Sequence, residues 1–475
     1  MVLEAVSLIA GFKLTLAEIR KPIIPPSAYA RVPKRPIPTR RCLNTSGKLN
    51  NPGTYIHPSC LKPVHRLPNE LLYAIFDIYC AESTLPKDAS AIVLSHVCRR
   101  WREIILRTSE FWTNIVVRRV TEHTSDRLQA YLNRSRTRGD PHMQPLTLDI
   151  DPNQETTLLD AILKSVLRDI GRCKHLKIST DLPRIDAFLD RLPASGGMPL
   201  LTSLDFKAYM WRFPEGIPWA RLTSLSLDCP MAGDCILELL PRCPGLVSLN
   251  LKKVLDTPVT PPPYEEEGVS WVVVLADLKT LSITSDDAPN ALYERLCCPA
   301  LQNIALTNIS FSMAPIEPTV IDAFLRRSEC NLLSFTLSDP EAVDDHIVQW
   351  LRLPSLQSIT HLTLQSPSIS APILDTLAAT PTPHQPVPLP SLTDLEVAKC
   401  VAGDSHLFDM VASRLGSADR TVSSLRKLKA TVDRGVDRQP ADFTTLRKAG
   451  VNVDVSYADL AGQIDFLGFN ALSFD

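Results

Sequence analysis

One apolar frame, written L-x-x-L-x-L with other apolar residues allowed in place of leucine, recurs through the second part of the chain. Two weaker copies begin at Met143 and Cys173. The clearer copies are Leu201/Leu204/Phe206, Leu222/Leu225/Leu227, Leu246/Leu249/Leu251, Leu278/Leu281/Ile283, Leu301/Ile304/Leu306, Leu332/Phe335/Leu337, Ile359/Leu362/Leu364, Leu392/Leu395/Val397 and Leu425/Leu428/Ala430. From Cys173 to Leu425 the frame advances nine times over 252 residues, a mean of 28 residues per repeat, with single steps of 21 to 33 residues. Because residues two apart share one face of a strand, each copy predicts a short strand buried on one side.

The segments between the copies predict helices that return the chain to the next strand, for example "GDCILELLPRC" (233–243) and "TVIDAFLRRSEC" (319–330). This pattern resembles leucine-rich repeats over roughly residues 140 to 456, since that family has a period of about 20–29 residues. The resemblance implies an α/β solenoid with a parallel sheet. The family's Asn or Cys, eight residues after the first leucine, is present only as Cys400. We therefore expect an irregular solenoid.

A pattern typical of helices occupies residues 65 to 117. The stretch "HRLPNELLYAIFDIYC" predicts an amphipathic helix that starts near Pro68, because its apolar residues recur at spacings of three and four. The stretch "LSHVCRRWREIILRTSEFW" also has one apolar and one charged face. The apolar face comprises Val97, Cys98, Trp101, Ile104 and Ile105, and the charged face comprises Arg99, Arg100, Arg102 and Glu103. We expect the charged face to be solvated.

Together these stretches resemble an F-box, and more narrowly the F-box-like domains that fungi carry ahead of repeat domains. The matching segments are "LPNELLYAIF" (67–76), "LSHVCRRWREI" (94–104) and "FW" (111–112). F-boxes dock on Skp1, the adaptor of cullin-RING ubiquitin ligases, so the resemblance implies a Skp1-binding surface and a layer supporting it. The residues carried over to that site are Leu67, Pro68, Leu71, Ile75, Val97, Cys98 and Trp101. The segment 77–92 departs from the family, because it is longer than in many F-boxes and lacks their usual Asp-Leu pair.

Four regions are expected along the chain. Residues 1–63 predict a flexible arm that is rich in proline and basic side chains, such as "RVPKRPIPTRR" (31–41). An F-box-like helical domain (64–118), a linker helix (119–139) and a leucine-rich-repeat-like domain (140–475) follow. Two proline-rich stretches, "TPVTPPPYEEE" (257–267) and "ATPTPHQPVPLP" (379–390), predict loops outside the stacked core.

The residues between the frame leucines are expected to form the exposed face of the sheet. Early copies offer Thr202, Ser203, Asp205, Thr223, Ser224, Ser226 and Ser248, which are small or acidic. Late copies offer the candidate target-binding residues Asp394, Glu396, Arg426, Lys427 and Lys429. This change of charge suits a target protein of mixed polarity. An ordinary solvated sheet face is the alternative interpretation.

Composition and motifs exclude several other functions. The net charge of −2 offers no field for a polyanion, so no nucleic-acid partner is expected. The sequence has no Cys/His cluster at zinc-ligand spacing and no hydrolase, metalloprotease or nucleotide-binding motif, so we expect no metal, no cofactor and no catalysis. The first apolar run is too short to span a bilayer and follows Glu4. We therefore expect no membrane association and a cytoplasmic or nuclear location, or both.

These patterns predict a substrate-recognition subunit of an SCF-type ubiquitin ligase, in which the F-box binds Skp1, and through it a cullin, while the repeats bind an unknown target protein. A leucine-rich-repeat scaffold whose degenerate F-box no longer binds Skp1 is the alternative. A third alternative is a hydrolase built on a different α/β core. This alternative requires that the repeat frame does not describe the fold.

Overall fold

The computed structural model describes residues 67–82, 87–118, 120–136, 144–151, 159–179, 191–192, 197–207, 213–255, 272–285, 288–309, 316–340, 342–365, 369–379, 387–416, 422–433 and 442–458. The expected basic arm at 1–63 lies outside these residues. So do the proline-rich stretch 257–267 and residues 380–386 of the second one.

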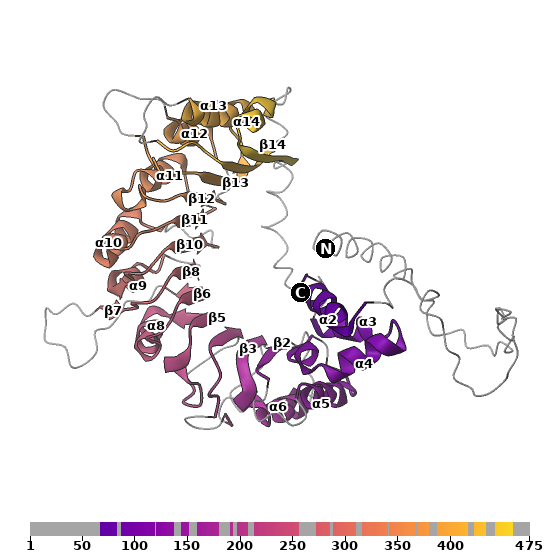
Figure 1. Cartoon of the computed structure of the whole chain (residues 1–475). Coiled ribbons are helices and arrows are strands. Elements are labelled where there is room, and N and C mark those ends of the chain that lie inside the picture. The colour runs from indigo at the N-terminus through magenta and orange to yellow at the C-terminus, as the bar shows by residue number, and fades with distance from the viewer. Residues whose placement is uncertain are drawn as a thin grey trace, which may run out of the picture. The chain divides into compact units, whose positions relative to one another are not determined.

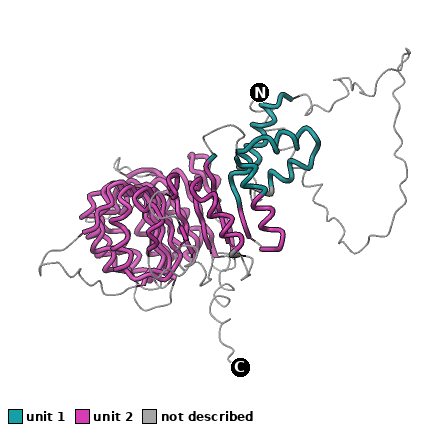
Figure 2. The backbone as a smooth tube through the Cα atoms, turned by 90° about the horizontal axis from the view of Figure 1, so that it is seen from below, with its two compact units in different colours: residues 1–115, 130–144 teal, residues 116–129, 145–475 magenta. Residues whose placement is uncertain are grey.

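Two compact units make up the described chain, and Figure 2 distinguishes them by colour. Unit 1 contains the residues up to Ile115 together with Ala130–Gln144, and unit 2 contains Val116–Gln129 and the residues from Pro145 onward. Helix α5 (Thr124–Arg134) lies within the range 119–139 where a linker helix was expected. The domain boundaries drawn from the sequence stay predictions.

Unit 1 is mainly helical. Its helices are α2 (Asn69–Glu82), α3 (Lys87–Ser95) and α4 (Arg99–Arg107), followed by the 3-10 helix η3 (Ser109–Trp112). Helix α2 begins one residue after Pro68, whose carbonyl accepts the backbone N–H of Leu72 at 3.1 Å. Helix α4 ends at Thr108, whose hydroxyl donates to the Ile104 carbonyl at 2.8 Å. The second stretch therefore forms two helices separated by a break at His96–Cys98, and not one continuous helix.

A 13-stranded sheet runs along the rest of the chain. Its strands, in spatial order, are β1 (Asn114–Val117), β2 (Leu146–Ile150), β3 (Cys173–Ser179), β4 (Ser203–Lys207), β5 (Ser224–Ala232), β6 (Ser248–Leu255), β8 (Thr280–Ser285), β10 (Asn303–Asn308), β11 (Ser334–Ser338), β12 (His361–Leu364), β13 (Asp394–Cys400), β14 (Lys427–Asp433) and β15 (Asn452–Ala458). From β2 to β15 every neighbouring pair is parallel.

Helices connect these strands and lie on one side of the sheet in unit 2 (Figure 1). They are α6 (Leu159–Leu167), α8 (Gly233–Leu239), α9 (Asn290–Arg295), α10 (Pro318–Ser328), α11 (Asp344–Leu351), α12 (Ala371–Leu377), α13 (Asp404–Leu415) and α14 (Thr444–Lys448). A short pair, β7 (Val273–Val274) and β9 (Leu296–Cys297), forms a second sheet. The expected fold class, a short helical region followed by a strand–helix solenoid with a parallel sheet, is confirmed.

The second and third apolar residues of the frame form two continuous rows across the sheet. The register aligns Leu176 with Leu204 and Ile178 with Phe206, and the same pairing continues strand by strand. From β2 to β14 every side chain in these rows is at most 2% exposed. Because the two rows bury their apolar surface against the helices, they explain why the frame specifies this sheet.

Two strands depart from the expected frame, β2 and β15, and β1 follows it. In β2 the register with β3 shifts after Leu146, and Leu148 and Ile150 pair with the frame residues Leu176 and Ile178. The buried residues are Leu146, Leu148 and Ile150, so the copy expected at Met143 is wrong. Strand β1 follows the spacing with an aromatic first residue, Trp112/Ile115/Val117. In β15 the first frame position is a glycine, which interrupts the pattern in the sequence.

A buried polar row lies at the middle of the sheet, close to the position where an asparagine was expected from the resemblance to leucine-rich repeats. Ser285, Asn308 and Asp339 stand seven residues after the first leucine of their copies, one residue earlier than expected. All three are at most 2% exposed. The Asn308 side-chain amide donates to the Asp339 carboxylate at 3.4 Å. A spacing of eight residues after the first leucine therefore does not identify this polar row.

Arg414 on α13 is a buried cation that fixes the chain around the second proline-rich stretch. It is 1% exposed, and its guanidinium donates to the carbonyls of Leu377 at 2.6 Å, Pro388 at 2.8 Å and Leu389 at 3.1 Å. These three carbonyls belong to α12 and to the residues before β13. One side chain therefore holds both ends of that connection.

Candidate functional site

Helix α2 has two apolar faces with different burial. Leu72, Phe76 and Cys80 recur at spacings of four and are buried inside unit 1. On another face, Leu71 is 52% exposed and Ile78 is 41% exposed. A small helical unit that leaves large aliphatic side chains in water presents a surface suited to another protein.

An aromatic cluster forms the core beneath that surface. The rings of Phe76 and Trp101 meet edge to face with centroids 4.7 Å apart, and Phe111 lies 6.5 Å from Phe76. The Trp112 indole donates to the Ile105 carbonyl at 2.8 Å and stacks on Tyr131 at 5.2 Å. Such contacts fix ring positions as well as burying area, so α2, α4 and η3 are held in one arrangement.

The break between α3 and α4 carries a further exposed aliphatic residue. Val97 is 46% exposed. The next residue, Cys98, is the N-cap of α4, and its Sγ accepts the Trp101 backbone N–H at 3.5 Å. Because sulfur is a weak acceptor, this cap contributes less than an oxygen would.

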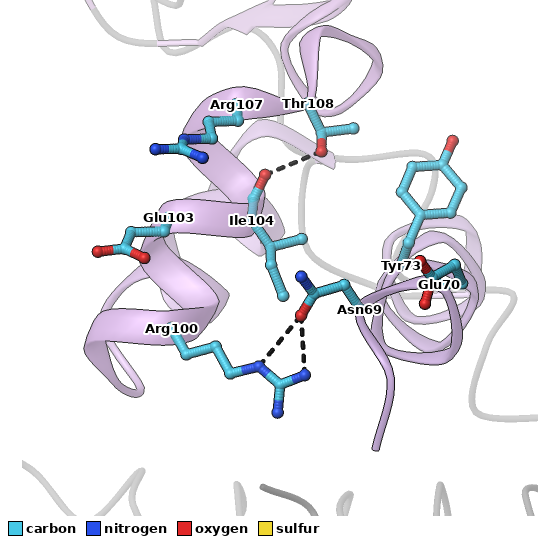
Figure 3. Close-up of a pocket in the computed structure, with 8 residues that line it drawn as sticks. All are labelled: Asn69, Glu70, Tyr73, Arg100, Glu103, Ile104, Arg107 and Thr108. Carbon is cyan, nitrogen blue, oxygen red and sulfur yellow. Dashed lines mark hydrogen bonds between the residues drawn. The ribbon is translucent and has the colours of Figure 1, made fainter. Parts of the chain in front are cut away.

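Arg100 ties the beginning of α2 to α4. Its Nη2 donates to the Leu67 carbonyl at 2.5 Å, and its Nε and Nη2 donate to Oδ1 of Asn69 at 3.1 and 2.8 Å. Figure 3 shows the hydrogen bonds between Arg100 and Asn69. Both residues line a hollow of about 500 Å³. The hollow is lined by Asn69, Glu70, Tyr73, Arg100, Glu103, Ile104, Arg107 and Thr108. Of the face expected to be solvated, Arg99, Arg102 and Glu103 are exposed, whereas Arg100 is only half-exposed because its guanidinium binds the Leu67–Asn69 segment.

The structure places the residues carried over to the Skp1 site at three depths. Pro68, Leu71 and Val97 are exposed, whereas Leu67, Ile75 and Cys98 are half-buried. Trp101 is 2% exposed, so it supports the surface and cannot itself reach a partner in this conformation. Ile78 and Tyr73 are exposed on the same helix and were not predicted, although Ile78 continues the spacing of Leu71 and Ile75.

The candidate target-binding residues lie on β13 and β14 or immediately before β14, and several of them neutralise one another. Lys429 Nζ is 2.6 Å from Oε1 of Glu396, and this hydrogen bond raises the pKa of Lys429. Asp394 accepts the Thr393 hydroxyl at 2.7 Å and lies 3.5 Å from Nε2 of His361. Arg426 and Lys427 are exposed and make no ion pair within the described chain. These five side chains therefore mix three cations with two carboxylates, and the exposed Asp454 on β15 lies beside Lys429.

Uncharged residues occupy the middle of the same face. Between the buried rows, strands β5, β6, β8, β10 and β11 carry only small or amide side chains: Ser224, Ser226, Ser248, Asn250, Thr280, Ser282, Asn303, Ala305, Ser334 and Thr336. Each of them is half-exposed. A partner on these strands would meet hydroxyl and amide groups, together with the ion pair of Asp228 on β5 and Lys252 on β6 at 3.7 Å.

Metal chemistry and thiol chemistry find little support in the described ranges. No group of three or more His, Cys, Asp or Glu side chains there could hold a metal ion. Within the same ranges no helix is long and apolar enough to cross a membrane. Burial raises the pKa of Cys173, Cys243 and Cys298 to about 12, so these thiols are poor nucleophiles near neutrality.

The helical unit has a recognisable relative among protein families. A family model described as F-box-like matches residues 64–118. Residues 64–118 are an F-box-like domain. No curated protein matches the chain. F-box domains generally bind Skp1, and F-box proteins are typically non-catalytic substrate receptors, so this match indicates the kind of partner that such a domain meets.

Proposed function

We propose that this protein is a non-catalytic substrate receptor of an SCF-type ubiquitin ligase, in which the F-box-like domain binds Skp1 and the leucine-rich-repeat-like sheet binds a target protein. The observation that carries the proposal is the F-box-like domain, whose α2 helix leaves Leu71 and Ile78 exposed above a closed aromatic core. Ubiquitin transfer would belong to other subunits, reached through Skp1 and a cullin. A cytoplasmic or nuclear location would fit this role.

The sheet supports the second half of the proposal. It places one uninterrupted set of exposed side chains from β2 to β15 on a single face, with the frame leucines buried behind it. Cross-strand pairs fix the charged side chains near the end of this face, as for Lys429 and Glu396. A rigid face with fixed charges favours selection among partners.

Co-purification of the full-length chain with Skp1 tests the proposal. We expect wild type to retain Skp1 in a one-to-one complex and Leu71→Asp to weaken binding at least about tenfold, because a carboxylate would then be buried against apolar groups. Leu71 is exposed in the free protein, so the change should not unfold the domain. Leu333→Asp is the matched control, an identical change at a leucine that is 38% exposed just before β11.

Failure of folded wild-type protein to retain Skp1 would contradict the proposal and favour a scaffold whose F-box does not engage Skp1. Equal retention by the Leu71 and Leu333 variants would instead show that α2 does not form the Skp1 surface. Circular dichroism of both variants establishes that each one is folded.

A further inference from the structure

The exposed face of the sheet carries ion pairs on both sides of an uncharged middle. On one side, Lys252 on β6 pairs with Asp228 on β5 at 3.7 Å. On the other side, Lys429 on β14 pairs with Glu396 on β13 at 2.6 Å. Three strands that lie between these pairs, β8, β10 and β11, carry no ionisable side chain on this face. Their outward residues are all half-exposed and form the neutral window: Thr280, Ser282, Thr284, Asn303, Ala305, Thr307, Ser334, Thr336 and Ser338.

The neutral window is suited to the buried centre of an interface. A charge that is buried without a partner costs free energy. The centre of a protein–protein interface is accordingly depleted in charged residues, whereas its rim is polar and solvated. No side chain of the window is larger than asparagine, so a partner can approach the strands closely. The two flanking ion pairs, and the exposed Lys279 just before β8, would then lie at the rim.

Exposed aliphatic side chains stand at both ends of the neutral window. At the carboxyl end, Ile309 is 48% exposed, and its N–H donates to the Ser285 carbonyl at 3.0 Å, so it continues β10. Because Asn308 is buried, the alternation along the strand places Ile309 on the same face as Thr307. At the amino end, Leu333 just before β11 is 38% exposed. Aliphatic groups left in water beside a charge-free surface suit contact with another protein.

The two aliphatic residues set the length of the segment that the neutral window accepts. The Leu333 N–H donates to the Gln302 carbonyl at 2.8 Å, so Leu333 is level with the residue before β10. Ile309 follows Gln302 by seven residues. At about 3.3 Å per residue, Leu333 and Ile309 therefore lie roughly 23 Å apart along the strands. A partner segment spans this length with about seven extended residues or about 15 helical ones.

We propose that the neutral window, with Ile309 and Leu333 at its ends, is the centre of the target-binding surface and accepts an uncharged segment of the target with an apolar side chain toward each end. The inference rests on the proposed function, in which the sheet binds a target protein. The hydroxyl and amide groups of the window can donate and accept hydrogen bonds, so they match uncharged polar groups of that segment. A charged segment would bind poorly, because no group of the window would pair with its charge.

Binding of displayed peptides to the full-length chain tests the inference. The probe is a phage library of random peptides of about 16 residues, long enough to span the window in either conformation. We expect the peptides enriched on wild type to share apolar and uncharged positions. They should bind at least about tenfold more weakly to Thr336→Lys and to Thr336→Glu alike, because either charge stays unpaired in the contact. Ile309→Asp and Leu333→Asp should weaken binding to a similar extent.

Matched controls carry identical changes outside the neutral window. Thr431→Lys and Thr431→Glu place the same charges on β14, where Thr431 is half-exposed on the same face. Leu200→Asp, at a leucine that is 41% exposed before β4, matches Leu333→Asp. We expect these control variants to bind the peptides as wild type does. Circular dichroism establishes that each variant is folded. Every variant should also retain Skp1 in co-purification, so a failure of Skp1 binding and a failure of this inference are distinguishable.

Three results would overturn the inference. Opposite effects of Thr336→Lys and Thr336→Glu on affinity would show that the partner brings a charge to the window. Peptides that lose binding to Lys427→Ala but not to the Thr336 variants would place the binding centre among the charges near β14. A wild-type chain that enriches no peptides beyond those enriched on Thr336→Lys protein would show that the window is not a binding surface.

Discussion

Arg100 connects two segments that lie 33 residues apart, through its hydrogen bond to the Leu67 carbonyl, and it also binds the Asn69 side chain. The amphipathic pattern places Arg100 correctly away from the apolar face of α4. It does not reveal the partner, because helical spacing gives the direction of a side chain around its own helix and nothing about the segment opposite. Trp101 shows the converse, since its spacing alone indicates the buried position that the structure gives it.

Replacing Arg100 should weaken Skp1 binding while leaving the domain folded. Arg100→Ala removes the donors that position the Leu67–Asn69 segment, next to the exposed Leu71. Hydrogen bonds to charged groups contribute about 1.5–3 kcal/mol, and the partial exposure of Arg100 lowers this, so we expect a loss of about 1–2 kcal/mol in Skp1 affinity by calorimetry. Arg102→Ala, at an exposed neighbouring arginine, is the control and should retain wild-type affinity. Equal losses in both variants would count against a positioning role for Arg100.

At the scale of single elements, the repeat frame predicts most strands because their buried rows need two apolar residues at fixed spacing. The frame fails where the backbone departs from that spacing, as at the register shift in β2. It also fails at Gly450, where φ of +94° suits glycine and leaves no side chain to mark the strand that follows. The buried contacts of Arg414 had no signal in the sequence, since they join carbonyls on separate elements.

Loss of the Arg414 guanidinium should destabilise the end of the sheet. Arg414→Met keeps an apolar stem but leaves the carbonyls of Leu377, Pro388 and Leu389 without this donor. We expect the free energy of unfolding to fall by about 2–4 kcal/mol in urea denaturation followed by circular dichroism, because buried acceptors lose their partners. Arg242→Met, at an exposed arginine, should change it by less than about 0.5 kcal/mol. A similar small change for Arg414→Met would mean that water satisfies these carbonyls.

At the scale of the whole molecule, the cysteines of unit 2 differ in their exposure to solvent. Cys173, Cys243 and Cys298 are buried, whereas Cys235 is exposed on α8. These four cysteines are free thiols. The sequence has no C-x-x-C pair. It could not separate the exposed thiol from the buried ones, because both kinds occur in apolar stretches.

Alkylation of the native protein should follow this difference. At pH 8 a thiol with a pKa of about 12 is ionised to only about one part in 10⁴, and burial also blocks the reagent. We expect iodoacetamide to label Cys235 in the native protein and to label Cys173, Cys243 and Cys298 only after denaturation, as measured by mass spectrometry of peptides. Rapid labelling of the three buried thiols in native protein would indicate that the sheet opens.

The order of the strands in space repeats their order along the chain, from β1 to β15. Each new strand of the 13-stranded sheet therefore meets an edge that was synthesised before it, and no strand has to wait for a distant segment. Nearest-neighbour stacking allows such a structure to propagate from a folded end. During translation the sheet can consequently grow one strand at a time as the chain leaves the ribosome.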